Sequence, residues 1–491
     1  MGTQTLKHLF LKLLPQKNIS DSDLNKGIRA LVLDGSCAQS MLVLTSGAFL
    51  TAFAVELGAS NFIIAIIAAI GPLCQILQIP SIFLVEKYHY RKLIVFSCAV
   101  TARVLWIPLA FLPWFISPSK AIYVMLILIL IMNLLGAPAA CAWNSWIRSF
   151  VPEEMFSTIF AKRMAYAIGS GAVLSLIAGF LVDRIKILCL LQTTPYSISF
   201  LLGTAFGIIG LLFIARIPEP VRHIKSEGEN KILKTLGKPF KNQQYKKLIL
   251  FMGVWSFATN MALPFFVVYM IRYLNIDVFM IIILSVINQS TTFAFYGIWG
   301  RLSNKFSNKS CLAVSSTLFI ISIGCWTMAE EHILIIPFLI ALHILMGIAT
   351  AGFSLCSNNL MLKMSPKHDS TAYLAACSMT VGLSAAVAPI IAVLIEKILM
   401  PYQFTFTLKF ISNGTPYYLN LLDYWKLDFI FLISCAVAIY ALTILSKLKE
   451  SGEKNTRQVY PELMFEIGQG LRSVSSVANL RILLKRPKLK K

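Results

Sequence analysis

Charged residues are scarce in this sequence of 491 residues. Asp, Glu, Lys and Arg make up 13% of it and hydrophobic residues 57%, whereas soluble domains are roughly a quarter charged. Acidic residues are scarcest, with 22 Asp and Glu against 44 Lys and Arg, a formal net charge of +22. Such a chain cannot cover a large soluble surface with charge. The composition therefore excludes an ordinary soluble globular protein and indicates many membrane spans.

Catalytic and metal-binding patterns are also missing. The sequence has no P-loop, no H-E-x-x-H and no G-x-S-x-G motif, and none of its ten cysteines forms a C-x-x-C pair. The cysteines lie mostly in apolar runs, which is typical of small core residues. We therefore expect no enzyme activity, no cofactor and no metal. We also expect no nucleic-acid partner, because no soluble segment is large enough to carry a basic binding surface.

Apolar runs of about 20 residues, the length that crosses a bilayer, recur along the sequence. Twelve spans are predicted, at 29–56, 61–85, 93–115, 121–147, 157–182, 196–217, 247–271, 276–299, 310–329, 333–362, 370–395 and 427–446. With the N-terminus in the cytoplasm, 36 of the 44 Lys and Arg lie on the cytoplasmic side, 7 lie outside, and Arg103 lies within a span. Because basic residues favour cytoplasmic loops, both termini are predicted to be cytoplasmic.

The longest basic loop divides the spans into six and six. We expect a cytoplasmic segment at 1–26, a six-helix bundle at 27–217, a basic cytoplasmic linker at 218–245, a second bundle at 246–446 and a basic tail at 447–491. The tail has apolar residues at helical spacing, namely Leu463, Ile467, Leu471, Val474, Val477 and Leu480. This spacing indicates an amphipathic helix on an anionic leaflet; a partly disordered basic tail is the alternative.

The two halves share a weak internal repeat. NSWIRSFVPEE (144–154) aligns with NNLMLKMSPKH (358–368) at an offset of 214, and VEKYHYRK (85–92) lies opposite SNKFSNK (303–309) at an offset near 218. Like-oriented halves of this kind are one of the repeat patterns of secondary transporters.

The loop GRLSNKFSNK (300–309) resembles the loop motif of the major facilitator superfamily, although Asn304 stands where that family usually has Asp. The resemblance covers about residues 25–446. It implies an all-α polytopic membrane fold of twelve transmembrane helices in two pseudo-symmetric six-helix bundles that rock about a central site. It also implies a cytoplasmic gate formed by Glu86, Lys87, Arg91, Lys92, Asn304, Lys305 and Lys309. The alternative is that these residues are ordinary topogenic charges.

Polar residues within the spans fall on shared helical faces. The resemblance implies that spans one, four, seven and ten line the central cavity. With one residue from span eight, the candidate substrate contacts are Thr45, Asn133, Trp143, Asn144, Arg148, Asn260, Gln289, His343, Thr350 and Asn358. Helix packing explains any single amide equally well, and a structural hydrogen bond is favoured for His343. The set is rich in amides and hydroxyls, which favours a neutral or zwitterionic solute.

Two ionised residues stand out within the spans. Asp34 lies in the inner part of the first span, and Arg103 lies about 15 Å into the third at 1.5 Å per residue. An ion pair between them would spare each an unpaired buried charge. Our hypothesis is that Asp34 carries a proton and that Arg103 tunes its titration. The alternative is a fixed structural ion pair.

Together these features predict a monomeric secondary transporter in the plasma membrane, the inner membrane of a bacterium. Its partners would be a small polar organic solute, a proton or another coupling ion, and membrane lipids. An exporter of amphiphiles is the alternative, because Trp143 and Trp255 also fall in the predicted cavity. A non-transporting assembly or sensor protein of the same fold is a weaker alternative.

Overall fold

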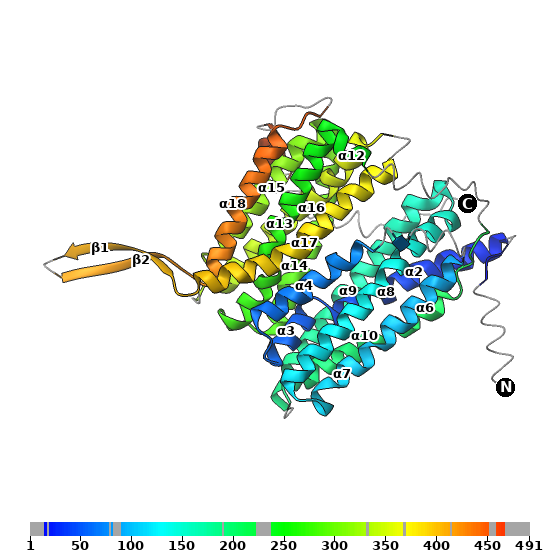
Figure 1. The fold of residues 1–491 in the computed structure, drawn as a ribbon, viewed down its shortest axis with the longest axis horizontal. Helices are drawn as coiled ribbons and strands as arrows, with labels where there is room; N and C mark the ends of the chain where they lie inside the picture. Colours follow the sequence, from blue (N-terminus) through cyan, green and yellow to red (C-terminus); the bar gives the residue numbers. More distant parts are fainter. Residues whose placement is uncertain are drawn as a thin grey trace, which may run out of the picture.

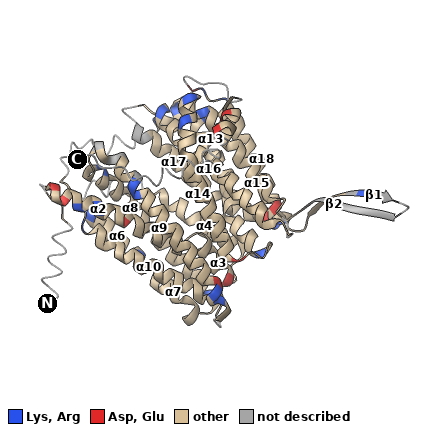
Figure 2. Cartoon of the chain, turned by 180° about the vertical axis from the view of Figure 1, so that it is seen from behind, with Lys and Arg blue, Asp and Glu red and all other residues tan. Residues whose placement is uncertain are grey.

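The computed structural model describes residues 14–16, 19–77, 80–81, 90–188, 191–221, 237–329, 333–366, 370–412, 415–450 and 458–466. Long apolar helices dominate these segments, and they gather in two bundles (Figure 1). Figure 2 shows Lys and Arg concentrated near helix ends, while the middles of the helices are almost free of charge. This distribution is the one that a bilayer imposes on spanning helices.

The N-terminal bundle comprises α2 (Asp21–Thr45), α3 (Ala48–Glu56), α4 (Asn61–Gln75), α6 (Arg91–Val104), α7 (Trp106–Phe115), α8 (Pro118–Phe150), α9 (Glu153–Leu188) and α10 (Thr194–Ile214). Side-chain caps start two of them, because Ser20 accepts from the Asp23 N–H and Ser60 from the Ile63 N–H. Gly47 separates α2 from α3 with a φ of 57°, a conformation that glycine adopts without steric cost.

The C-terminal bundle comprises α13 (Gln243–Arg272), α14 (Val278–Lys305), α15 (Asn308–Trp326), α16 (Ile335–Met364), α17 (Ser370–Leu399) and α18 (Leu427–Ser446). The short helix α12 (Lys238–Lys241) precedes it on the cytoplasmic side. Ser307 stands where the family loop motif usually has Gly, and it caps α15 by accepting from the Ser310 N–H at 3.1 Å.

Eleven helical segments in the described part of the chain are long and apolar enough to cross a membrane. The shorter apolar helix α4 occupies the position of the predicted second span, whose remainder lies mostly outside the described residues. The helical fold of two bundles therefore agrees with the prediction. Several helices are longer than the predicted spans: α8 has 33 residues and α9 has 36. Each helix continues beyond its apolar run into residues of mixed polarity.

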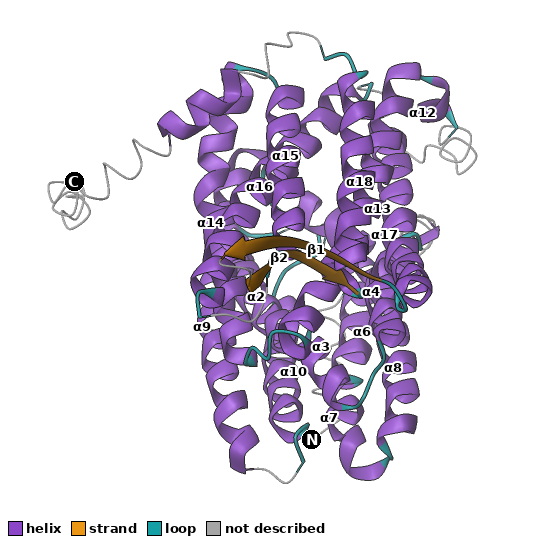
Figure 3. Cartoon of the chain, turned by 90° about the vertical axis from the view of Figure 1, so that its left-hand side faces the viewer, coloured by secondary structure: helices purple, strands orange, loops and turns teal. Residues whose placement is uncertain are grey.

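A β-hairpin between α17 and α18 was not predicted. Strands β1 (Gln403–Ser412) and β2 (Thr415–Trp425) pair antiparallel with a register shift between Phe406 and Thr407, and the hairpin projects from the outer side of the C-terminal bundle (Figures 1 and 3). Phe404, Phe406 and Phe410 are about half exposed on it. The predicted spans on either side, ending at 395 and beginning at 427, lie within a few residues of the observed helix limits.

A further short helical segment, at 458–466, packs on the C-terminal bundle. Val459 is fully buried in that bundle's core and Leu463 is 3% exposed. Glu462 pairs with Lys305 at 2.7 Å and Glu466 with Arg301 at 2.6 Å. Leu463 was predicted to be the first residue of an apolar helix face that contacts lipid. It packs against protein instead, which corrects the prediction for this residue. Ile467, Leu471, Val474, Val477 and Leu480 lie outside the described residues.

Candidate transport site and gates

A buried charge cluster lies in the N-terminal bundle where α2, α6, α9 and α10 meet. Asp34 is 3% exposed, and its Oδ2 lies 3.9 Å from Arg163 Nη2 of α9. Its Oδ1 is buried and has no hydrogen-bond partner among the described residues. A buried carboxylate with one unpartnered oxygen is costly, so this position is a candidate functional site and not a packing element.

The predicted partner of Asp34 was only partly right. Arg103 lies beside the carboxylate, since a Cβ at Gly210 would lie 3.3 Å from Arg103 Nη1 and 3.4 Å from Asp34 Oδ1. However, Arg103 donates to the Gly207 carbonyl at 2.5 Å, and the ion pair forms with Arg163. Arg163 was not predicted as a partner because it was counted with the cytoplasmic charges at the start of span five, whereas α9 continues on both sides of it.

The charge cluster interrupts the apolar core of the N-terminal bundle. One apolar cluster lies on the outer side, around Phe53, Phe200 and Leu109, and another on the cytoplasmic side, around Leu31 and Trp146. The C-terminal bundle has one continuous apolar cluster from Tyr245 to Leu463. The two bundles thus share a fold, but in the described residues only the N-terminal bundle has its core divided by ionised side chains.

Several predicted cavity residues are accessible, and they come from both halves of the molecule. The Arg163 guanidinium lies over the Trp143 ring at 4.9 Å, and Asn144 and Arg148 are exposed one and five residues further along α8. In the C-terminal half, Gln289 and Asn358 are exposed, whereas Asn133, Asn260 and Thr350 are half-buried. Three amides, Asn133, Asn260 and Asn358, donate to carbonyls of their own helices.

Three predicted cavity residues lie inside their own bundles. Thr45 is 3% exposed and faces α10, because a Cβ at Gly203 would meet its methyl group at 2.7 Å. His343 is 7% exposed, with Nδ1 2.8 Å from the Leu339 carbonyl and its ring against Trp326. Trp255 is 3% exposed and stacks on Phe353 at 4.8 Å. All three side chains are packed or hydrogen-bonded within their own bundle. This corrects the placement of Thr45 and Trp255 in the cavity and agrees with the structural hydrogen bond favoured for His343.

The two bundles are joined at their outer ends. Arg272 of α13 donates to Asn61 Oδ1 at 2.6 Å and also to the Ala59 carbonyl, and Asn61 donates to Glu396 of α17 at 2.6 Å. At the start of α14, the Phe279 N–H donates to Asp183 of α9 at 2.9 Å. We call these contacts the outer gate. Val278 and Ile282 of α14 also enter the outer apolar cluster of the N-terminal bundle.

The cytoplasmic ends of the bundles diverge. Figure 1 shows the helices meeting near α3, α4 and the start of α14 and separating toward α12 and the start of α2. The hydrogen bonds of the outer gate join the bundles at this end. With the predicted cytoplasmic termini, the bundles meet at their outer ends and diverge toward the cytoplasm (Figure 1).

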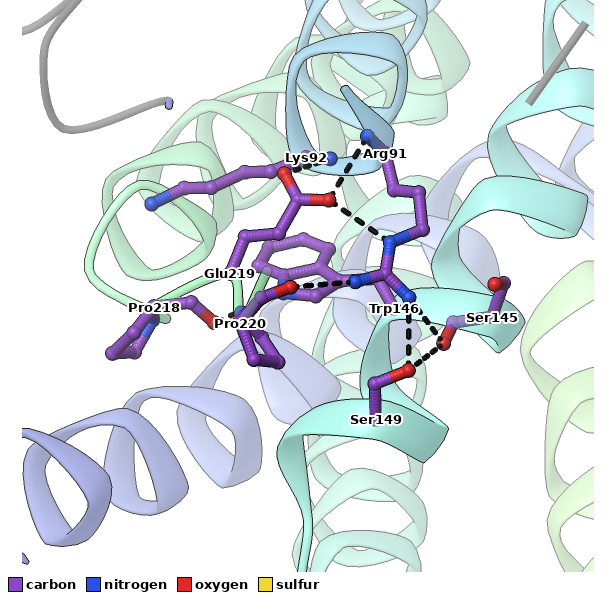
Figure 4. Close-up of polar contacts among 8 residues, drawn as sticks. All are labelled: Arg91, Lys92, Ser145, Trp146, Ser149, Pro218, Glu219 and Pro220. Carbon is purple, nitrogen blue, oxygen red and sulfur yellow. Dashed lines mark hydrogen bonds and ion pairs between the residues drawn. The ribbon is translucent and has the colours of Figure 1, made fainter. Parts of the chain in front are cut away.

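A carboxylate clamp organises the cytoplasmic end of the N-terminal bundle (Figure 4). Glu219, which follows α10, is 1% exposed and accepts from the N–H groups of Arg91 and Lys92 at 3.1 Å each and from Arg91 Nε at 2.9 Å. Arg91 also donates to Ser149 Oγ at 2.8 Å and to the carbonyls of Ser145 and Pro220. The carboxylate therefore caps the N-terminus of α6 and neutralises its first cation.

The C-terminal bundle repeats the clamp with different residues. Glu450, which follows α18, accepts from the Lys309 N–H at 2.7 Å, at the start of α15, and from Lys363 Nζ at 2.7 Å. Burial raises the pKa of Glu450, but the hydrogen bonds from Lys363 and from the Lys309 N–H outweigh it and hold that pKa below its ordinary value. Both clamp carboxylates were missed. The signal that could have found them is an acid directly after the last span of each half.

The predicted cytoplasmic gate residues whose contacts the structure describes bind groups of their own half. Arg91 and Lys92 bind Glu219, Lys305 pairs with Glu462, and Lys309 binds Glu450 and the Ser446 carbonyl. Asn304 is exposed. Glu86 and Lys87 lie outside the described residues, so their role in a latch between the bundles stays a prediction.

Comparison with known proteins shows which family has this architecture. The family model described as Major Facilitator Superfamily matches residues 248–488. The chain belongs to the major facilitator superfamily. Its members are transporters, so the chain is an integral membrane secondary transporter and not an enzyme. No curated protein matches the sequence.

Solved structures of the superfamily share the whole fold. A mutant of the nucleoside transporter NupG superposes with a TM-score of 0.67 at 13% identity, covering 87% of this chain and 100% of that one. The inward-open xylose transporter XylE from E. coli gives 0.60 at 14%, covering 89% and 99%. A D-xylose-proton symporter gives 0.62 at 13%, covering 88% and 99%. At these identities the likeness concerns the fold alone.

Proposed function

We propose that this superfamily member carries a small polar organic solute, neutral or zwitterionic, across the plasma membrane by alternating access coupled to protons. The observation that carries the proposal is the closed outer gate beside diverging cytoplasmic ends. Such an arrangement is one of the two end states that a rocking-bundle transporter requires. The outer gate consists of a few polar contacts between helix ends, which a rigid-body rotation can break and re-form.

The solute class rests on the polar side chains. Asn144, Gln289 and Asn358 offer amide donors and acceptors without a fixed charge, which suits hydroxyl- or amide-bearing solutes. Arg148 adds one cation that a zwitterion's carboxylate can use. Structural neighbours named as nucleoside and xylose transporters support this class. A bacterial inner membrane is consistent with the fold and is part of the proposal.

Proton coupling rests on Asp34. Its unpartnered Oδ1 can hold a proton, while Arg163 at 3.9 Å can compensate the carboxylate when that proton leaves. Arg103, held by Gly207, keeps a second cation beside the site. Burial and the two nearby cations act on this carboxyl in opposite senses. A helix movement that shifts either arginine would change that balance.

Uptake into proteoliposomes tests the proposal. The probes are radiolabelled nucleosides, pentoses and neutral amino acids, each with and without an imposed pH gradient. Wild type should accumulate one class when the outside is acidic. Asp34→Asn should lose gradient-driven accumulation yet keep solute exchange, because exchange needs no net proton release. Asp21→Asn, which removes an exposed carboxylate from the same helix, is the matched control.

Two results would count against the proposal. Accumulation by Asp34→Asn equal to that of wild type would remove the proton role. Binding of amphiphilic cations alone would favour the amphiphile exporter instead. One reason for that alternative is already weaker, because Trp255 packs in the core of the C-terminal bundle.

A further inference from the structure

A second polar site lies at the cytoplasmic end of the N-terminal bundle, away from the charge cluster. A cavity of about 520 Å³ opens there between α2, the start of α6 and the end of α10. Four of its lining side chains are cationic: Lys26, Arg29, Lys92 and Arg216. The one carboxylate in the lining, Asp23, accepts from the Ser20 hydroxyl at 2.7 Å at the start of α2. The cavity therefore has a strong excess of positive charge.

The cations differ in how they are held. Lys92 is 1% exposed, and its Nζ donates to the Ala215 carbonyl at 2.9 Å, which fixes one ammonium group in the cavity wall. Arg216 lies over the Phe213 ring at 5.9 Å. Lys26, Arg29 and Arg216 are exposed. One buried cation with three accessible ones around it can surround an anion from several sides.

The lining becomes apolar toward the membrane interior. Leu33 and Phe213 line the cavity together with the cations, and Leu33 is 45% exposed. Leu33 lies seven residues beyond Lys26 on α2, about 10 Å further along the helix axis. The site therefore has a cationic rim at the cytoplasmic surface and an apolar wall at the depth of the acyl chains. A soluble anion would use the rim alone.

We propose that this cavity binds an anionic phospholipid of the cytoplasmic leaflet. Lys26, Arg29 and Arg216 hold its phosphate near the buried Lys92 ammonium, and an acyl chain lies along Leu33 and Phe213. Basic pockets between transmembrane helices on the cytoplasmic side suit lipid headgroups of this kind. Lys92 also belongs to the clamp, because its N–H donates to Glu219. The lipid thus contacts the residue that links α6 to the end of α10.

Native mass spectrometry of the purified full chain tests the site without any transport assay. The probes are phosphatidylglycerol, phosphatidylcholine with the same acyl chains, and glycerol 3-phosphate. Wild type should retain one phosphatidylglycerol at least about tenfold more tightly than phosphatidylcholine, since a tenfold ratio needs only about one charge-assisted hydrogen bond. Lys26→Gln, Arg29→Gln and Arg216→Gln together should abolish that preference.

The matched control removes the same charge from the same side of the membrane. Lys162→Gln, Lys241→Gln and Lys246→Gln together alter exposed cytoplasmic cations outside the cavity, and this variant should bind as wild type does. Equal retention of both lipids by wild type would overturn the proposal, as would equal loss in both triple variants. Glycerol 3-phosphate binding as tight as phosphatidylglycerol would overturn it too, because the apolar wall would then contribute nothing.

Discussion

At the scale of single residues, the molecule concentrates its buried charge in a few partnered positions. Glu219 and Arg91 form an ion pair with side chains 0% and 3% exposed, and the remaining Arg91 donors bind Ser149 and the Ser145 and Pro220 carbonyls. Asp34 is the opposite case, since one of its oxygens has no partner among the described residues. Full satisfaction indicates a structural role, and incomplete satisfaction at a buried charge indicates a role that requires a change of state.

Replacement of Glu219 should be strongly destabilising. Glu219→Gln removes the charge that compensates the buried Arg91, which typically costs about 3–5 kcal/mol. The thermal unfolding midpoint in detergent should fall by several degrees. The control is Glu462→Gln, whose partner Lys305 has a side chain 56% exposed, and which should cost at most about 1 kcal/mol. Equal shifts for the two variants would contradict the assignment of Glu219 as a clamp.

Stability should depend on pH through Glu450. Its folded-state pKa lies below the ordinary value of 4.5, so the carboxylate form stabilises the protein above that value, and this contribution is lost as pH falls through the folded-state pKa. Glu450→Gln should therefore be less stable than wild type at pH 7, and the difference should shrink below about pH 4.5. Unfolding midpoints measured against pH check this. A difference that stays constant with pH would rule the account out.

At the scale of helices, close packing in the C-terminal bundle depends on glycine. A Cβ at Gly352 of α16 would lie 2.6 Å from the Trp299 ring and 2.7 Å from Ser315 Cβ. Trp299 is fully buried and donates to the Ile348 carbonyl, so it cannot move aside cheaply. Gly352 thus lets α14, α15 and α16 approach one another, in the way that small residues do in membrane bundles.

Gly352→Ala should lower the unfolding midpoint, because overpacking of a rigid core costs about 1–3 kcal/mol. Gly136→Ala is the matched control on α8, since nothing lies within 4 Å of the added methyl group. That substitution should be neutral or stabilising by up to about 1 kcal/mol, because alanine favours the helix. Scanning fluorimetry of the two variants would refute the packing account if both moved the midpoint in the same direction.

The helices themselves were predictable from sequence, but their partners were not. Apolar runs predicted the helices in their order, because hydrocarbon admits few structures besides helices, and basic loops predicted the direction of the spans. Helical spacing cannot say which neighbour a face meets. Thr45 was therefore predicted in the cavity although it faces α10 of its own bundle. Arg163 was missed because it was counted among the cytoplasmic charges, although it lies within the predicted span 157–182 and within α9. The hairpin was missed because short alternating segments give a weak signal.

At the scale of the whole molecule, one end holds the two bundles together. The outer gate joins α3–α4 of one bundle to α13 and α17 of the other through Asn61, Arg272 and Glu396. The cytoplasmic clamps act within each bundle. Each bundle is thus closed by its own carboxylate, and we expect the contacts that differ between transport states to lie between the bundles. This division is what rigid-body alternation requires.

Loss of the outer gate should shift the protein toward an outward-facing state. Arg272→Gln removes the cation that joins Asn61 and the Ala59 carbonyl to α13. Spin labels at Lys120 and Lys397, exposed on the outer ends of the two bundles, should report longer distances in this variant. The labels require a background without the ten native cysteines. The control is Arg184→Gln, because Arg184 packs on Phe180 of its own helix. Distances that match wild type in both variants would contradict the assignment of Arg272 to the outer gate.

The clamps also set the order in which the chain can finish folding. Glu219 follows Arg91 by 128 residues, and Glu450 follows Lys309 by 141. At a synthesis rate of about 5–20 residues per second, the start of α6 exists for roughly 6 to 26 s before its carboxylate has been made. During that time Arg91 has no counterion from Glu219 and must stay at the aqueous surface. Each half therefore becomes complete only when its last span has been synthesised, and the N-terminal half is complete before the second half begins to emerge.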